Sequence, residues 1–192
     1  INPADLDKLD FDVLILHQLP DLQGYSRNFL PKLLSKNKPT FFILGGQSDV
    51  LTFNGMQQAI GINVQRGKTD QVTAKLNAAF KRFNLSEEQL AIFTKFPTLT
   101  VPFGEYATGG GTDIVLHQQV GNVGTGRALL AINTTTPRKA AVLAGEGIWR
   151  WRLEEYELTE QQSIVDEIIL KTIQLISQKE DKRKLRVYTT AP

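Results

Sequence analysis

The pattern of apolar and polar residues is clearest in the first quarter of the chain, where two almost continuous apolar runs flank a stretch with helical spacing. The runs, residues 11–16 and 39–46, are typical of strands that are covered on both faces. Between them, residues 25–36 carry apolar side chains three and four positions apart, which predicts a helix. The three elements together predict a right-handed βαβ unit with parallel strands.

The rest of the chain alternates between shorter helical and extended patterns. Helices are predicted from Ser48 or Asp49 to Gln58, from Ser86 to just before Pro97, and over residues 159–179. Extended segments are predicted as short edge strands within 60–76 and as strands at 98–102, 114–120, 127–133, 139–144 and 185–188, with a flexible loop at 105–112.

These elements predict an α/β fold. We expect a mostly parallel, flavodoxin-like central sheet with helices on both faces and with antiparallel strands added late in the chain. One domain is expected over residues 1–180, and residues 181–192 are expected to form a linker or the start of a following domain.

Composition narrows the classes of function. The formal net charge of +2 gives no strong attraction to nucleic acid, so no nucleic-acid partner is predicted. The chain has no cysteine, which excludes thiol catalysis and thiolate metal sites, and it has only two histidines. We predict neither a metal site nor a cofactor. No apolar run is long enough to span a membrane, and a chain that begins at Ile1 is expected to be processed or cut from a longer protein.

Candidate functional residues follow the predicted strands, because ligands of doubly wound sheets gather beyond the carboxyl ends of parallel strands. These residues form a candidate cleft: His17, Gln18, Gly45, Gly46, Gln47, Ser48, Glu146 and Trp149.

One interpretation of this cleft is a hydrolase in which His17 is the base, Ser48 the nucleophile and Glu146 the residue that orients the base. A structural role explains the same residues more simply. Ser48 stands where a helix N-cap belongs, and the G-x-S-x-G motif of a nucleophile elbow is absent. His17, at a strand end, is expected to form hydrogen bonds with neighbouring residues.

Residues 11–16 and the run from Lys38 to Gln47 resemble the opening of class I glutamine amidotransferase domains. The resemblance implies that the catalytic cysteine position is Leu44 and that the oxyanion loop falls on His17 and Gln18. It also aligns residues 141–146 with the family's strand that ends in His-Pro-Glu, which places Ala144 at the histidine position and matches only Glu146. The resemblance therefore implies a degenerate site at Leu44, Ala144 and Glu146 with no amidotransferase activity.

Residues 145–152 and 179–188 resemble, more specifically, the amidotransferase-like domain of large membrane-anchored bacterial proteins. This resemblance implies a periplasmic or other extracytoplasmic domain, with a cytoplasmic location as the alternative. It also implies that the membrane is reached only through flanking segments and that a first strand–helix unit precedes Ile1.

The function expected from these observations is a non-catalytic interaction or scaffolding domain whose partners are proteins or other domains of the same chain. Two alternatives stay open. One is the hydrolase that uses His17, Ser48 and Glu146, and the other is a domain that binds a small ligand or carbohydrate through Trp and Tyr side chains at the rim of the cleft.

Overall fold

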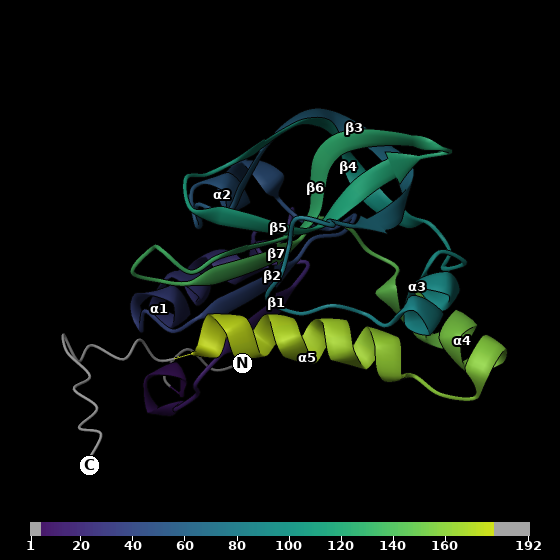
Figure 1. The fold of residues 1–192 in the computed structure, drawn as a ribbon. Coiled ribbons are helices and arrows are strands. Elements are labelled where there is room, and N and C mark those ends of the chain that lie inside the picture. Colours follow the sequence, from purple (N-terminus) through teal and green to yellow (C-terminus); the bar gives the residue numbers. More distant parts are fainter. Residues whose placement is uncertain (1–4, 179–192) are drawn as a thin grey trace, which may run out of the picture.

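The computed structural model describes residues 5–178, which form one seven-stranded sheet with helices packed against part of it (Figure 1). The strands are β1 (Leu14–His17), β2 (Thr40–Ile43), β3 (Ile60–Leu76), β4 (Leu99–Thr108), β5 (Thr112–Val120), β6 (Val123–Asn133) and β7 (Ala140–Leu143). The helices are α1 (Leu30–Ser35), α2 (Val50–Asn54), α3 (Glu87–Phe93), α4 (Ile148–Thr159) and α5 (Ser163–Ser177), with 3₁₀ turns η1 (Leu6–Lys8) and η2 (Tyr25–Asn28).

The parallel part of the sheet consists of β1, β2 and β7, which lie side by side in that order. Thr40 at the start of β2 pairs with Leu14 on one side and with Ala140 on the other. The parallel pairing of the two strands predicted for the first quarter of the chain is therefore confirmed. These strands have only four residues each, and β7 is buried along its whole length, which explains its continuous apolar sequence.

The expectation of a mostly parallel, flavodoxin-like sheet is wrong. The strand order is β1-β2-β7-β6-β5-β3-β4, with two parallel pairings at one end and four antiparallel pairings in the rest. The error arose because an apolar pattern marks a strand without giving the direction of its neighbour. In particular, the pieces expected as short edge strands within residues 60–76 form one long strand, β3, that pairs with both β4 and β5.

The flexible loop expected at residues 105–112 is also largely strand. Glu105 to Thr108 belong to β4 and Thr112 begins β5, so only the triple glycine turns the chain. Gly109 is required in this turn because a Cβ atom there would lie 2.0 Å from the carbonyl oxygen of Gln58. The prediction of a flexible loop was based on the three glycines alone, whereas in the structure they form a tight turn.

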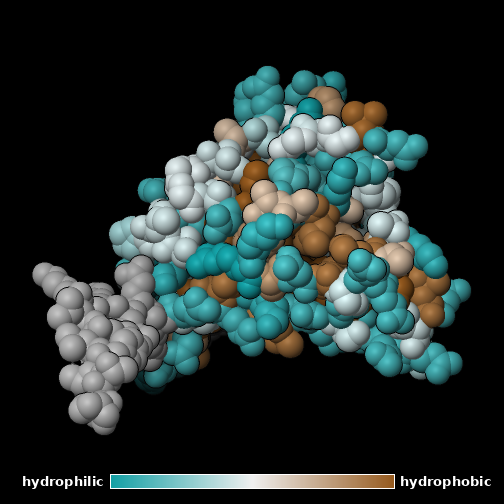
Figure 2. Space-filling model, viewed as in Figure 1, coloured by the Kyte–Doolittle hydropathy of each residue, from teal (hydrophilic) through white to brown (hydrophobic). Residues whose placement is uncertain are grey.

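Two apolar cores lie on opposite faces of the sheet, because successive side chains of a strand point to opposite sides. Phe41 packs in the core that contains Trp151 and the buried face of α5, whereas Phe42 packs with Phe53 of α2 at a ring separation of 5.3 Å. Figure 1 shows α5 running along one face, and in the same view Figure 2 shows hydrophobic residues reaching the surface between α5 and the upper strands.

The helix predicted from Ser86 is confirmed, and a capping box between Ser86 and Gln89 holds its first turn. The long helix predicted over 159–179 begins later, at Ser163, because a separate helix, α4, precedes it. The strand-like segment 185–188 and the linker expected at 181–192 lie outside the described residues.

Candidate functional site

The loop that follows β2 lies at the carboxyl edge of the parallel strands, where the candidate cleft was expected. Three consecutive backbone amides of this loop donate hydrogen bonds to side chains of the same chain. The pairs are Gly45 N to Ser48 Oγ at 3.0 Å, Gly46 N to Glu146 Oε2 at 2.7 Å and Gln47 N to Gln18 Oε1 at 2.9 Å. Residues from the ends of all three parallel strands therefore meet at this loop.

Gly45 makes the close approach of Glu146 possible. A Cβ atom at this position would lie 2.3 Å from Glu146 Oε2 and 2.7 Å from the Cδ atom of Gln18. Gln18 itself follows β1 in the left-handed region, with φ of 56°, a conformation that side chains other than glycine rarely adopt. The turn after β1 and the glycine after β2 thus bring the two side-chain oxygens onto the loop.

Strand β4 fixes the backbone of Glu146. The Glu146 amide donates to the Thr100 carbonyl at 2.9 Å, and the Thr100 amide donates to the Glu146 carbonyl at 3.1 Å. This pair of bonds joins the far edge of the antiparallel region to the end of β7. The carboxylate therefore extends from a backbone that is held on both of its hydrogen-bonding groups.

Ser48 is buried and contributes its hydroxyl to the loop rather than to a helix cap. Asp49 caps α2 instead, because its Oδ1 accepts a bond from the Thr52 amide at 3.2 Å. The Thr52 hydroxyl, which donates to the Asp49 carboxylate at 2.6 Å, lowers the pKa of Asp49. The helix was predicted to start at Ser48 or Asp49, and the interpretation of Ser48 as its N-cap is wrong, because Asp49 caps the helix.

Asp21 holds the neighbouring turn. Its carboxylate accepts bonds from the amides of Tyr25 and Ser26 at 2.9 and 2.8 Å. The Ser26 hydroxyl, followed by these amides, lowers the pKa of Asp21 to about 2 against the opposing effect of burial. Asp21 also forms a backbone bridge with Ser48, so the turn before η2 is attached to the loop after β2.

A cavity of about 230 Å³ opens beside this loop, between α2 and the β3–β4 pair. Among the predicted cleft residues, Gly45, Gly46 and Ser48 line this cavity, whereas His17, Gln18, Gln47, Glu146 and Trp149 do not. The other lining residues were not predicted: Leu22, Asp49, Val50, Leu51, Val64, Gln65, Arg66, Gly67, Lys68, Thr69, Thr100, Val101 and Pro102.

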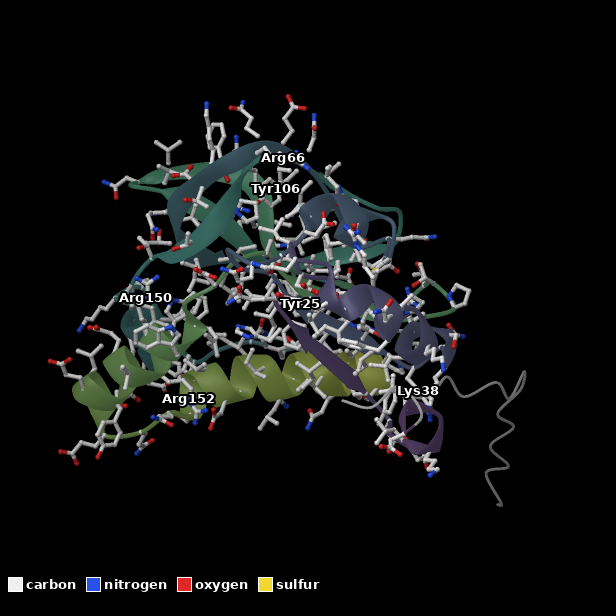
Figure 3. The ribbon with its side chains drawn as sticks, turned by 180° about the vertical axis from the view of Figure 1, so that it is seen from behind. Tyr25, Lys38, Arg66, Tyr106, Arg150 and Arg152 are labelled. Atoms are coloured by element: carbon white, nitrogen blue, oxygen red, sulfur yellow. The ribbon has the colours of Figure 1, made fainter. Side chains whose placement is uncertain are left out.

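The wall of this cavity is a bulge in β3 between Val64 and Thr69, where the pairing with β4 shifts. Gly67 lies in the bulge with φ of 72°, and a glycine inside a strand pattern was the sequence signal that could have located it. On β4, opposite the bulge, Tyr106 donates to the Pro102 carbonyl of the same strand at 2.7 Å. Burial raises the pKa of Tyr106 to about 12, and Figure 3 shows Tyr106 and Arg66 in this strand layer.

The structure does not bring His17 and Ser48 together. The His17 side chain is exposed on the edge strand β1, Ser48 is buried, and no hydrogen bond joins them within residues 5–178. Leu44 and Ala144, which the resemblance placed at the cysteine and histidine positions, are fully buried and apolar. The arrangement at this edge therefore contains a polar loop without a paired nucleophile and base.

Trp149 lies on an exposed face of α4, away from the cavity. In the described part of the chain, no group of three or more His, Asp or Glu side chains is placed to hold a metal ion. None of the helices between residues 5 and 178 has the length and hydrophobicity needed to cross a membrane.

Comparisons with known proteins give distant structural similarities. No family model and no curated protein matches the chain. The mmIFT52 N-terminal domain has a TM-score of 0.43 at 15% identity, over 97% of this chain and 83% of that one. Alpha-L-fucosidase isoenzyme 2 from Paenibacillus thiaminolyticus has a TM-score of 0.47 at 10% identity, over 86% of this chain and 25% of that one. A cytoplasmic protein from Salmonella typhimurium LT2, STM1381, has a TM-score of 0.44 at 8% identity, over 83% and 73%. At these scores the similarities assign no function.

Proposed function

We propose that this chain is a non-catalytic interaction or scaffolding domain. The observation that carries the proposal is the loop after β2, in which an apolar Leu44 precedes three amides that are already bonded to Ser48, Glu146 and Gln18. A hydrolytic site at this edge needs an attacking atom and free donors for the charge that develops on the substrate. Here Leu44 offers no attacking atom, and the three amides already donate to side chains of the same chain.

The occupied amides argue most directly against acyl-transfer chemistry. An oxyanion hole works through donors that point at an empty position where negative charge develops. Here Glu146 places a carboxylate oxygen 2.7 Å from the Gly46 amide, so negative charge of the chain itself fills this position. A substrate oxygen would have to displace a charge-assisted hydrogen bond.

Ser48 is a poor nucleophile in this setting. Its hydroxyl oxygen accepts the Gly45 amide proton, and the side chain is buried. A serine needs a neighbouring base to lose its proton, and His17 is exposed on β1 without a hydrogen bond to Ser48.

The proposal extends to the setting of the domain. The resemblance to amidotransferase-like domains of large membrane-anchored bacterial proteins supports an extracytoplasmic module whose partners are proteins or other domains of the same chain. This part of the proposal rests on the sequence resemblance alone.

The cavity beside the loop supports binding of a small ligand as a second candidate function. Apolar side chains such as Val50, Val64 and Val101 line it, and Arg66 and Lys68 lie in the bulge that forms its wall. This combination suits a small amphipathic anion. A thermal-shift screen of such compounds tests it, since a ligand at 100 times its Kd stabilises a protein by about 2.7 kcal/mol. Replacing Val64, which packs on the α2 side of the sheet, with Phe to fill the cavity should abolish any shift.

Two experiments test the non-catalytic proposal. A fluorophosphonate probe should leave the protein unlabelled, with Ser48→Ala as the matched control; stoichiometric labelling that disappears in this variant would refute the proposal. In the second, Leu44→Cys should show no glutaminase turnover, because the glycine before this position and the histidine are missing as well. Measurable turnover in a folded Leu44→Cys protein would show that the site lacks only the cysteine thiol, and it would contradict the proposal.

A further inference from the structure

Helix α4 exposes three large apolar side chains on one face. Trp149, Leu153 and Tyr156 are 62%, 59% and 56% exposed, and they follow one another at the spacing i, i+4, i+7. This spacing places them in a single stripe along the helix. Single exposed apolar residues are ordinary, whereas a contiguous stripe that ends in Trp and Tyr has the composition of a protein interface.

The stripe is presented on a rigid support. On the opposite side of α4, Trp151 is fully buried, donates its indole N–H to the Pro97 carbonyl at 2.7 Å, and packs edge-on against Phe93. Glu155 binds the first turn of α5 from the same buried side. Because the helix is already ordered, a partner that docks on the stripe loses little conformational entropy from α4.

Charges divide α4 into two unlike halves. The first half carries Arg150 and Arg152, and the second half carries Glu154 and Glu157, followed by Glu160 at the C-cap. Figure 3 shows both arginines at the end of the molecule that holds α4. A helix with a basic first half and an acidic second half is complementary to a copy of itself that runs in the opposite direction.

We infer that α4 is a self-association surface, on which the α4 helix of a second copy packs antiparallel. The inference rests on the proposed function and names the partner of the interaction domain as a second copy of this chain. A two-fold axis that places Trp149 opposite Tyr156 of the second copy puts Leu153 close to the axis. It also brings Arg150 within two residues, about 3 Å along the helix axis, of Glu157 of the second copy.

Arg150 keeps donors available for this contact. Arg150 uses one Nη to donate to the Thr98 carbonyl at 2.7 Å, and a guanidinium has five N–H groups. Arg152 faces position 153 of the second copy, next to the axis, and its charge is already paired within the chain with Asp166 at 3.4 Å. A helix of 12 residues is about 18 Å long. Contact along one such helix buries less surface area than a standard protein interface, so the dimer should be of modest affinity.

Sedimentation equilibrium of the purified chain at concentrations up to about 200 μM tests the inference, because an interface of micromolar Kd is populated there. The wild-type chain should show a reversible monomer–dimer equilibrium. Leu153→Glu places two like charges at the axis and should weaken the dimer at least tenfold. Leu170→Glu is the matched control, since Leu170 on α5 is 57% exposed but lies outside the stripe, and it should leave the equilibrium unchanged.

Cysteine cross-linking tests the orientation, because the chain has no cysteine of its own. A mixture of Trp149→Cys and Tyr156→Cys proteins should form a mixed disulfide faster than either variant forms one with itself. A strictly monomeric wild-type chain, an equal loss in Leu153→Glu and Leu170→Glu, or faster self-linking of the single variants would each overturn the inference. None of these results depends on the fluorophosphonate labelling, so the two proposals fail separately.

Discussion

The buried carboxylate of Glu155 on α4 accepts a 2.6 Å hydrogen bond from the amide of Ile164, in the first turn of α5. Its second oxygen accepts the Val165 amide at 3.0 Å. A side chain from one helix therefore performs the capping that no residue at the start of α5 provides, since the N-cap Gln162 makes no side-chain cap bond. This contact joins α4 to the start of α5.

Glu155→Ala should lower the free energy of unfolding by about 2–4 kcal/mol, because two buried amides lose a charged acceptor. Glu155→Gln keeps one acceptor oxygen and should lose about half as much. Urea denaturation monitored by circular dichroism measures both. Glu157→Ala, two residues away on the exposed side, should stay within about 0.5 kcal/mol of wild type; an equal loss there would contradict the capping role.

The two tryptophans of α4 should respond in opposite ways to substitution. Trp151→Ala removes a fully buried side chain and its bond to Pro97, and it should cost about 3–5 kcal/mol. Trp149→Ala should change stability by less than about 0.5 kcal/mol, because this side chain is 62% exposed. Denaturant midpoints give the stabilities, and acrylamide quenching of the single-tryptophan variants gives the exposure. Similar quenching of both tryptophans would contradict the described position of α4.

Gly45 and Glu146 should be energetically coupled. Gly45→Ala places a methyl carbon 2.3 Å from Glu146 Oε2, so it should displace the carboxylate from the Gly46 amide at a cost of about 1–2 kcal/mol. In a Glu146→Ala background the same substitution should cost less, with a coupling energy of about 0.5–1.5 kcal/mol in a double-mutant cycle. Gly124→Ala, with no atom within 4 Å of its added Cβ, is the control. Strict additivity would mean that Glu146 does not occupy the loop in solution.

Asp21 should make stability depend on pH in the acid range. Its folded pKa of about 2 lies below the value of about 3.9 expected in the unfolded chain, so its contribution is present above about pH 4 and is lost as the pH falls toward 2. Asp21→Asn should therefore be less stable than wild type at pH 7, and the two urea midpoints should converge between pH 4 and pH 2. Asp10→Asn, at a fully exposed carboxylate, should follow wild type throughout. A difference that stays constant down to pH 2 would exclude the titration of Asp21 as its cause.

The sequence predicted the elements of this fold better than their arrangement. The parallel pairing of β1 and β2 was predictable because continuous apolar runs around a helical stretch indicate strands that are buried on both faces. The directions of strands β3 to β6 could not be predicted, because the same alternation fits parallel and antiparallel neighbours. The bulge around Gly67 divides β3 into two alternating pieces, which is why a single 17-residue strand resembled several short ones.

Strand ends predicted which polar residues gather at one edge of the sheet, but they did not predict the cavity beside them. Gly45, Ser48 and Glu146 lie together because parallel strands bring their carboxyl ends to one edge. The cavity wall comes from β3 and β4, which reach this edge only through antiparallel pairing. The position of Trp149 was missed for a related reason: its exposure depends on which face of α4 turns toward α3 and α5.

Strand β3 contributes side chains to both cores, with Ile60 and Ile62 on one side of the sheet and Val72 on the other. Local unfolding of one core therefore also disturbs the backbone of β3, whose other side chains are packed in the second core. Such a shared strand makes the loss of structure cooperative, so near-ultraviolet and far-ultraviolet signals should report the same single transition on heating. It also means that a fragment cut within β3 should leave neither half with a complete interior.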